Sequence, residues 1–216
     1  MTTPTNVTVF GASGKIGRHV VHQLLDAGHH VTAYVRDPAK LTTTHPDLNV
    51  IVGGLDDLEA ITRAVTGADA VISALGPSLR RSATGTPVAD GTRRIVDAMD
   101  AAGVRRFTGL ATPSVADPHD QPTIKGALLP RFARLTMPNA MTELVAMTDA
   151  VTGSDLDWTI ARITNPTNRP AKGRTRAGYL GRDKVGWAMT RADIAAFLIS
   201  QIADNNYSRA LPAISN

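Results

Sequence analysis

The amino-acid sequence predicts a doubly wound α/β fold, in which helices cover both faces of a parallel sheet. Three observations support this prediction. Short apolar runs alternate with segments of helical periodicity along most of the chain. A glycine-rich turn follows the first apolar run directly. The length of 216 residues, 43% of them hydrophobic, suits one domain with a substantial core.

The individual elements follow from these patterns. Apolar runs predict strands at Asn6–Phe10, His30–Val35, Asn49–Gly53, Asp69–Ala74, Arg105–Ala111, Asp157–Ala161 and Arg209–Ile214. Helical periodicity lies between them, at about Lys15–Ala27, Asp57–Thr66, Val88–Ala102, Asn139–Thr152 and Arg191–Ala203. Strands that alternate with helices imply right-handed βαβ crossovers.

Two stretches interrupt this alternation. Residues 112–138 are rich in proline, and residues 163–190 are rich in Arg, Gly and Thr. Ligands of open α/β sheets bind beyond the carboxyl ends of the strands, where such irregular segments lie. We therefore expect one domain, residues 1–216, whose substrate side is formed by about residues 112–138 and 163–190. The second stretch should form a small irregular C-terminal lobe.

The composition excludes several kinds of chemistry. The chain has no cysteine, which rules out disulfides and thiol catalysis, and its six histidines lack metal-ligand spacing. The net charge is a modest +4, although eight basic residues between Arg162 and Arg191 are compatible with an anionic ligand. No pattern of a signal peptide, membrane span or nucleic-acid surface is visible. We expect a cytoplasmic monomer or homodimer that contacts neither nucleic acid nor membrane.

The glycine-rich turn has the spacing G-x-x-G-x-x-G over residues 11–17. It lies between the first strand and the first helix, which is where a dinucleotide-binding fingerprint belongs. Gly11 would make the tight turn, Gly14 would let the backbone approach a pyrophosphate, and Gly17 would allow close helix–strand packing. The helix N-terminus would then supply N–H donors and a positive dipole end for phosphate. The fold class is therefore predicted to be Rossmann-type.

The end of the second strand indicates which dinucleotide binds. An acidic residue there would contact the ribose 2′-hydroxyl of NAD, but the chain has Arg36 at this position. A guanidinium matches a phosphate in a two-pronged contact, so Arg36 with Lys40 favours the 2′-phosphate of NADP(H). Asp37 leaves two alternatives open, because it could pair with Arg36 or face the ribose itself.

The chain resembles the atypical short-chain dehydrogenase/reductases, specifically the NAD(P)H-binding group with NmrA-like proteins and biliverdin-IXβ/flavin reductases. The resemblance covers nearly the whole chain and is carried by residues Gly11–Gly17, Val35–Pro38, Ala64–Gly76, Ser154–Arg162 and Thr190–Ala195. It implies a Rossmann fold and a nicotinamide cofactor. The candidate cofactor-binding residues are Gly11, Ser13, Gly14, Lys15, Ile16, Gly17, Arg36, Lys40, Gly54, Leu55, Ala74, Leu75 and Gly76.

The resemblance also implies what some of these residues contact. Residues 74–76 would line the nicotinamide-side ribose, and Gly54 with Leu55 would lie by the adenine. The group often has Asp at the position of Gly54, a departure that affects this adenine contact. Thr112 and Ser114 would lie near the nicotinamide as candidate catalytic residues. Pro113 between them departs from the usual pattern.

Typical short-chain dehydrogenases relay a proton through a Tyr-x-x-x-Lys pair. None of the three tyrosines of this chain has a lysine four residues later. By the spacing of the family, the two positions fall on Leu135 and Asn139. The usual alcohol–ketone mechanism is therefore not expected, and only His119 among the histidines lies in the substrate-side segments.

A conjugated acceptor can take hydride and draw its proton from solvent, so a pocket that positions it can suffice. The sequence therefore favours an NADPH-dependent reductase of a flavin, quinone or similar small-molecule conjugated acceptor. Two alternatives remain at this point. One is a non-catalytic NADP(H)-binding redox sensor or regulator, and the other is a biosynthetic isomerase or lyase on the same scaffold.

Overall fold

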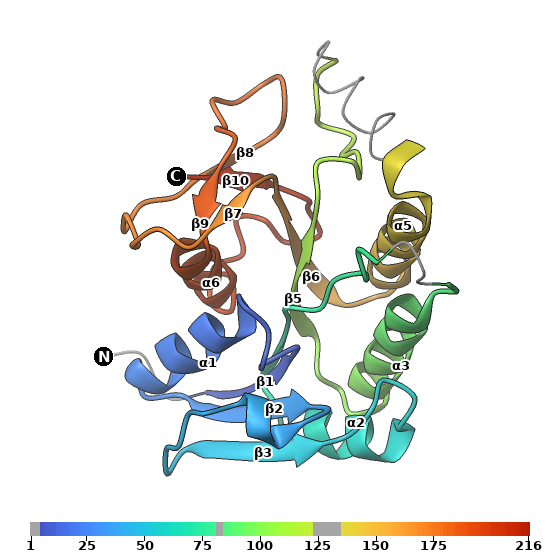
Figure 1. Ribbon diagram of the computed structural model, residues 1–216, viewed down its shortest axis with the longest axis vertical. Coiled ribbons are helices and arrows are strands. Elements are labelled where there is room, and N and C mark those ends of the chain that lie inside the picture. Colours follow the sequence, from blue (N-terminus) through green and yellow to red (C-terminus); the bar gives the residue numbers. More distant parts are fainter. Residues whose placement is uncertain (1–4, 81–83, 123–134) are drawn as a thin grey trace.

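The computed structural model describes residues 5–80, 84–122 and 135–216. A sheet of eight strands runs through the molecule in the order β3-β2-β1-β4-β5-β6-β10-β8 (Figure 1). These strands are β1 (Asn6–Phe10), β2 (His30–Val35), β3 (Leu48–Val52), β4 (Ala70–Ser73), β5 (Arg106–Ala111), β6 (Asp157–Ile163), β8 (Arg176–Gly178) and β10 (Ala213–Ser215). The order 3-2-1-4-5-6 is that of the doubly wound Rossmann fold, which confirms the predicted fold class.

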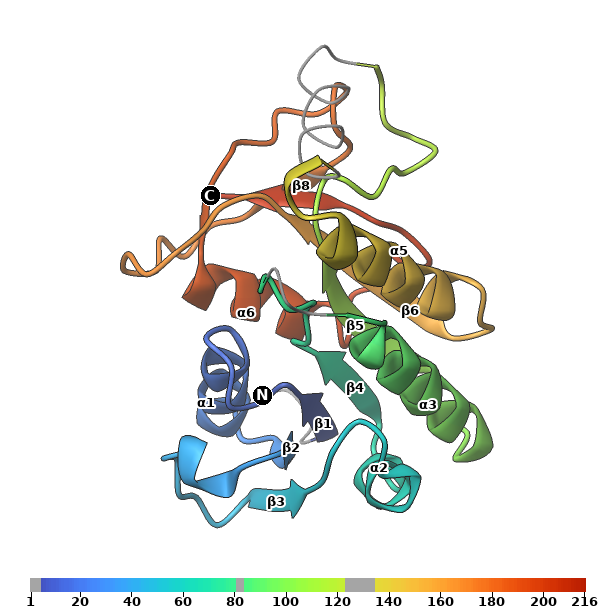
Figure 2. The ribbon, with the colours of Figure 1, turned by 45° about the vertical axis from the view of Figure 1, so that its right-hand side comes forward.

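Helices lie on both faces of this sheet (Figure 2). They are α1 (Gly17–Asp26), α2 (Leu58–Val65), α3 (Pro87–Ala101), α5 (Pro138–Thr152) and α6 (Arg191–Ser200), with the short 3-10 helix η1 (Pro38–Lys40) after β2. One apolar core packs α2, α3 and α5 against the sheet, and the second packs α1 and α6. The inner strands are buried on both faces, as parallel strands between two helical layers must be.

The C-terminal part of the sheet differs from the prediction. β8 pairs antiparallel with β10, so the sheet is mixed at this edge. The segment 163–190 is also less irregular than expected, because it contains β8 and a second small sheet of β7 (Pro166–Thr167) and β9 (Met189–Thr190). These strands have two or three residues, too few for an alternating pattern in the sequence.

The strands β1, β2, β4, β5 and β6 run parallel and place their carboxyl ends at one edge. The glycine turn follows β1 there, and the segment after residue 111 follows β5. Residues 123–134 of the predicted substrate-side segment lie outside the described residues. In the part of the chain that is described, no helix is long and apolar enough to cross a membrane.

Candidate functional site

The glycine turn packs directly on the segment after β4. Gly11 has a φ of +74°, in the left-handed region that glycine adopts without strain. A Cβ on Gly11 would lie 2.9 Å from the carbonyl carbon of Ala74 and 3.1 Å from the backbone nitrogen of Leu75. Two of the predicted cofactor segments, residues 11–17 and 74–76, therefore touch through their backbones.

The rest of the turn forms a closed backbone loop under the start of α1. The Gly14 N–H donates to the Gly11 carbonyl at 2.9 Å. A Cβ at position 17 would clash with that same carbonyl oxygen, so only glycine fits where the helix meets the turn. Ser13 is half-buried, whereas Gly14 and Lys15 are exposed on the open side of the loop.

α1 begins without a side-chain cap among the described residues, since its N-cap residue is Ile16. Uncapped N–H groups at a helix N-terminus, beside a loop too tight for side chains, form a ready anion site. This backbone fits the pyrophosphate of a dinucleotide. The fit depends on the tightness of this loop, because a Cβ on Gly11 or Gly17 would clash with neighbouring backbone.

The end of β2 presents basic groups from two elements. The Asp37 carboxylate pairs with the Lys40 ammonium at 3.4 Å and also accepts from the Ala39 N–H, which caps η1. Arg36 is exposed and has no ion-pair partner within the described chain. Arg18 of α1 donates to the Lys40 carbonyl at 2.9 Å. The first alternative left open for Asp37, a pair with Arg36, is therefore not observed.

The structure shows what surrounds Gly54, the residue expected near the adenine. A Cβ on Gly54 would clash with the Asp56 carboxylate, which lies over the glycine. The Gly54 carbonyl accepts the Tyr34 hydroxyl at 2.6 Å. Burial, followed by the charges of Asp57 and Asp56, raises the pKa of Tyr34 to about 12. Leu55 is half-buried.

Leu55 packs on α3, where a Cβ on Gly91 would lie 2.6 Å from the Leu55 Cβ. The Leu55 carbonyl accepts the Arg94 guanidinium at 3.0 Å. These contacts hold the Leu55 side chain against α3.

A pocket of about 240 Å³ lies between the segment after β4 and the start of α5. It is lined by Ser78, Leu79, Arg80, Thr136, Met137, Pro138, Asn139 and Ala140. Asn139, the position of the missing lysine, is thus on its wall. Leu135, the position of the missing tyrosine, is 83% exposed next to the lining residues. Its described lining is mainly apolar, and neither group of the usual proton relay occurs among those residues.

Thr112 and Ser114 follow the end of β5 in a tight turn. The Val115 N–H donates to the Thr112 carbonyl at 3.0 Å, and the Ser114 N–H makes a long contact of 3.4 Å with the Thr112 hydroxyl. Both side chains are half-buried. The Thr112 hydroxyl oxygen accepts this weak hydrogen bond, so the hydroxyl proton is still available for donation to another group. Pro113 fits within the turn.

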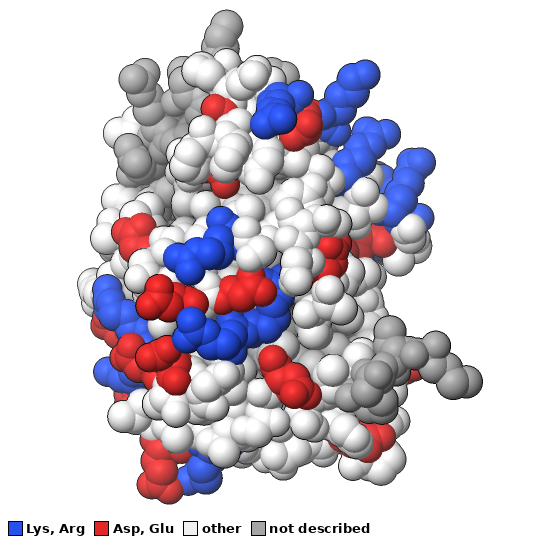
Figure 3. Space-filling model, turned by 180° about the vertical axis from the view of Figure 1, so that it is seen from behind, with Lys and Arg blue, Asp and Glu red and all other residues white. Residues whose placement is uncertain are grey.

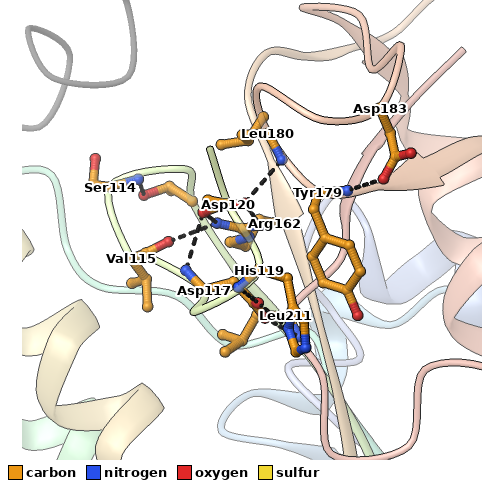
Figure 4. A network of polar contacts seen from close by, with 11 residues as sticks. Ser114, Val115, Asp117, His119, Asp120, Arg162, Tyr179, Leu180, Asp183 and Leu211 are labelled. Carbon is orange, nitrogen blue, oxygen red and sulfur yellow. Dashed lines mark hydrogen bonds and ion pairs between the residues drawn. The ribbon is translucent and has the colours of Figure 1, made fainter. Parts of the chain in front are cut away.

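The chain beyond this turn wraps around a buried arginine (Figure 4). The guanidinium of Arg162, which is 0% exposed, binds both carboxylate oxygens of Asp120, at 2.5 and 2.8 Å. It also donates to the Val115 carbonyl at 3.1 Å. Burial alone would raise the pKa of Asp120, but hydrogen bonds from Arg162 and from the Asp117 and Leu180 N–H groups outweigh it, so the pKa is lowered.

A second carboxylate, Asp117, organises His119 in the same network (Figure 4). Asp117 accepts the backbone N–H and the ring Nδ1 of His119, each at 2.8 Å, and the Leu211 N–H at 3.1 Å. The His119 ring lies against the Tyr179 ring, with centroids 4.8 Å apart. Sequence reasoning singled out His119 but not the two aspartates.

Asp117 and Asp120 could not be recognised from the sequence, because aspartates in a proline-rich stretch usually make local turns. Arg18 was also missed, although a basic residue directly after the glycine turn was an available signal. No group of His, Asp and Glu suited to a metal ion occurs within residues 5–80, 84–122 and 135–216.

Basic residues of the segment 162–191 do not act as one group. Arg162 is buried, Arg191 binds the Asn168 side chain, and Lys172 donates to the Asn216 carbonyl. The remaining ones are exposed and comprise Arg169, Arg174, Arg176, Arg182 and Lys184. Figure 3 shows basic side chains gathered along one edge of the molecule, above a region where both charges mix.

Comparison with known proteins identifies the family. The family model described as NAD(P)H-binding matches residues 11–205. The chain therefore belongs to the NAD(P)H-binding family, and the resemblance predicted from its motifs is confirmed.

Two curated relatives match the chain over about half of its length. A 3-beta-hydroxysteroid dehydrogenase of Mycolicibacterium neoaurum is 34% identical over 119 residues, which are 50% of this chain and 32% of the relative. A (4-alkanoyl-5-oxo-2,5-dihydrofuran-3-yl)methyl phosphate reductase of Streptomyces griseus is 34% identical over 112 residues, 52% of this chain and 36% of the relative. The chain thus spans about a third of the length of these relatives.

Two solved structures share the fold over almost the whole chain. A short-chain dehydrogenase/reductase of Veillonella parvula in complex with NADP has a TM-score of 0.80 at 21% identity, covering 99% of this chain and 95% of that chain. The anaerobillin reductase ChuY of Escherichia coli O157:H7 has a TM-score of 0.79 at 19% identity, covering 98% and 97%. At these identities the likeness establishes the fold.

Proposed function

We propose that the protein is an NADPH-dependent reductase of a flavin, quinone or similar conjugated acceptor. The observation that carries this proposal is the mainly apolar pocket next to the segment 74–76, where Leu135 and Asn139 replace the usual tyrosine and lysine. A site of this kind can position and dehydrate a planar acceptor, but it cannot relay a proton from an alcohol. The relatives named as reductases support the same class of reaction.

Residues of the glycine turn and of the β2 end would hold the cofactor, which supplies the hydride when bound. The backbone of residues 13–17 and the α1 N-terminus bind the pyrophosphate. Arg36 binds the 2′-phosphate, helped by Lys40 and by Arg18. The backbones of Gly54 and Leu55 would lie by the adenine, and residues 74–76 would lie by the nicotinamide-side ribose.

The other residues of the site act on the acceptor. Thr112 and Ser114 orient the acceptor and the nicotinamide end through their hydroxyl groups. The apolar pocket wall, including Leu79 and Met137, excludes water from the acceptor. Residues 1–216 would form one domain, with about residues 112–138 and 163–190 as its substrate side, acting as a monomer or homodimer.

The proposal is tested by following NADPH oxidation with riboflavin, FMN, menadione and biliverdin as acceptors. We expect turnover of at least one acceptor by the wild-type protein and none by Gly14→Val, which should not bind cofactor. Simple aliphatic alcohols and steroid alcohols, each tested with NADP⁺, are the negative controls and should give no reaction. Tight NADPH binding without turnover of any acceptor would contradict the reductase proposal and favour an NADP(H) sensor.

A further inference from the structure

Asp117 is a buried charge that the proposed cofactor site does not use. Its side chain is only 3% exposed. Burial of a carboxylate is unfavourable unless hydrogen bonds or an opposite charge compensate it. Asp117 receives one hydrogen bond from the Leu211 N–H and two from His119, one of them from the imidazole ring. His119 is thus the residue with which this carboxylate is most fully engaged.

The contact with Asp117 determines how the imidazole is oriented. Nδ1 faces the carboxylate at 2.8 Å and therefore carries a proton that it donates. Nε2 then points away from the carboxylate, on a side chain that is 60% exposed. Tyr179 packs against one face of the ring, with an angle of 34° between the ring planes. The ring is held on two sides while Nε2 stays accessible.

The Asp117–His119 pair is anchored at the edge of the sheet where ligands of this fold bind. Arg162 is paired in register with Ala111, the last residue of β5, so both lie at the carboxyl ends of their strands. The Arg162 guanidinium holds the chain on either side of Asp117 through Val115 and Asp120. The Asp120 carboxylate also accepts the Leu180 N–H at 2.8 Å, which ties this loop to the segment after β8.

The charged groups around the ring leave His119 as the proton-exchanging group. Asp120 is neutralised by Arg162, and the segment after β8 adds Arg182 and Asp183 beside the Tyr179 ring. Burial, followed by the charge of Asp117, raises the pKa of Tyr179, so its hydroxyl stays protonated at neutral pH. Three carboxylates and two cations surround the ring, which suits proton transfer rather than the binding of an anion.

We propose that His119 is the general acid of the reaction, with Asp117 as its positioning residue. This inference rests on the proposed function. Hydride adds to the conjugated acceptor and leaves a negative charge on it, and the His119 Nε2–H bond breaks to give that anion its proton. The neutral imidazole then regains a proton from water, so one hydride and one proton are consumed per acceptor reduced. Asp117 holds the ring so that Nε2 points away from the carboxylate.

The test compares His119→Ala with the wild-type protein, using FMN and menadione as acceptors. We expect kcat to fall by about a hundredfold, as on loss of a general acid, with NADPH affinity unchanged. Wild-type kcat should decline with rising pH, because only a protonated Nε2 can donate. This decline should vanish in the variant, and added imidazole should restore part of the rate. His30→Ala, at the opposite edge of the sheet, is the matched control and should keep wild-type rates.

A second measurement does not depend on turnover. Nitrogen-15 NMR of the imidazole should show a proton on Nδ1 of neutral His119, and Asp117→Asn should reduce the share of this tautomer because the carboxylate no longer fixes it. Two results would overturn the role of His119 without affecting the reductase proposal. One is a proton on Nε2 instead of Nδ1 in the neutral ring. The other is a kcat in His119→Ala within threefold of wild type, with the same pH profile. If wild type binds NADPH but reduces neither acceptor, the reductase proposal fails first and this role fails with it.

Discussion

The Asp37 carboxylate lies 3.4 Å from the Lys40 ammonium, so the acid at the end of β2 is engaged within its own turn. It also caps η1 through the Ala39 N–H. An acid used in this way is less available to a ribose 2′-hydroxyl. The neighbouring Arg36 remains exposed, and nothing in the described chain neutralises it. The geometry thus favours a phosphate over a hydroxyl at this position.

From this relationship we expect NADPH to bind at least about tenfold more tightly than NADH, a difference of about 1.4 kcal/mol. Arg36→Ala should bring the two affinities close together, whereas Lys40→Ala should have a smaller effect because its ammonium is already paired. Calorimetric titration of both cofactors measures the ratio. Arg63→Ala, which removes an exposed arginine of α2, is the control. A preference that survives Arg36→Ala would show that another group binds the 2′-phosphate.

Gly14→Val should abolish cofactor binding while the protein still folds. Gly14 lies outside the left-handed region and is exposed, so the added side chain fills the pyrophosphate space without backbone strain. Its Cβ would be 3.0 Å from the Gly11 carbonyl oxygen, a tight but tolerable contact. Gly17→Val, in contrast, should destabilise the fold because its Cβ clashes with that oxygen. Thermal unfolding and NADPH titration of both variants distinguish these outcomes. Normal NADPH affinity in Gly14→Val would contradict the assigned phosphate position.

Thr112→Val and Ser114→Ala should each lower kcat by about tenfold or less, below the hundredfold or more typical of losing a general acid. Their hydroxyl groups are expected to orient the reactants rather than to transfer a proton. Steady-state rates with the best acceptor check this, with Thr142→Val on the exposed side of α5 as a control. A loss of about a thousandfold at either position would assign the proton transfer to that hydroxyl instead.

Asp120→Asn should destabilise the protein by about 3–5 kcal/mol, since it leaves the buried Arg162 guanidinium without its counter-charge. Asp100→Asn, in an exposed pair with Arg105, should change stability by less than about 1 kcal/mol. Denaturant unfolding at neutral pH compares the two. Equal losses would show that the buried pair adds no more stability than the exposed one.

The same ion pair predicts a pH dependence. Because the folded protein lowers the pKa of Asp120, its contribution to stability is complete above the unfolded pKa of about 4. The contribution is then lost as the pH falls further, through the folded pKa. Wild type should therefore lose stability in acid more steeply than Asp120→Asn does. Parallel acid-unfolding curves would contradict this assignment.

Much of the fold was predictable because its signals are local. The buried runs β1 and β2 were placed with their observed bounds, and the helices were found to within three residues at either end. α1 begins at Gly17 rather than Lys15, since the tight glycine turn continues to that residue. The antiparallel β8 was missed because a three-residue strand at a sheet edge has no period of its own.

The sequence by itself determined the Rossmann topology and the glycine turn, because strand periodicity and glycine spacing act over a few residues. Only the tertiary structure decided which side chains meet. Arg162 and Asp120 are 42 residues apart in the chain, and Leu211 reaches Asp117 across 94. Such contacts depend on the register of β6 and β10, which no local pattern specifies. Hence the glycine turn could be predicted from the residues, whereas the orientation of His119 could not.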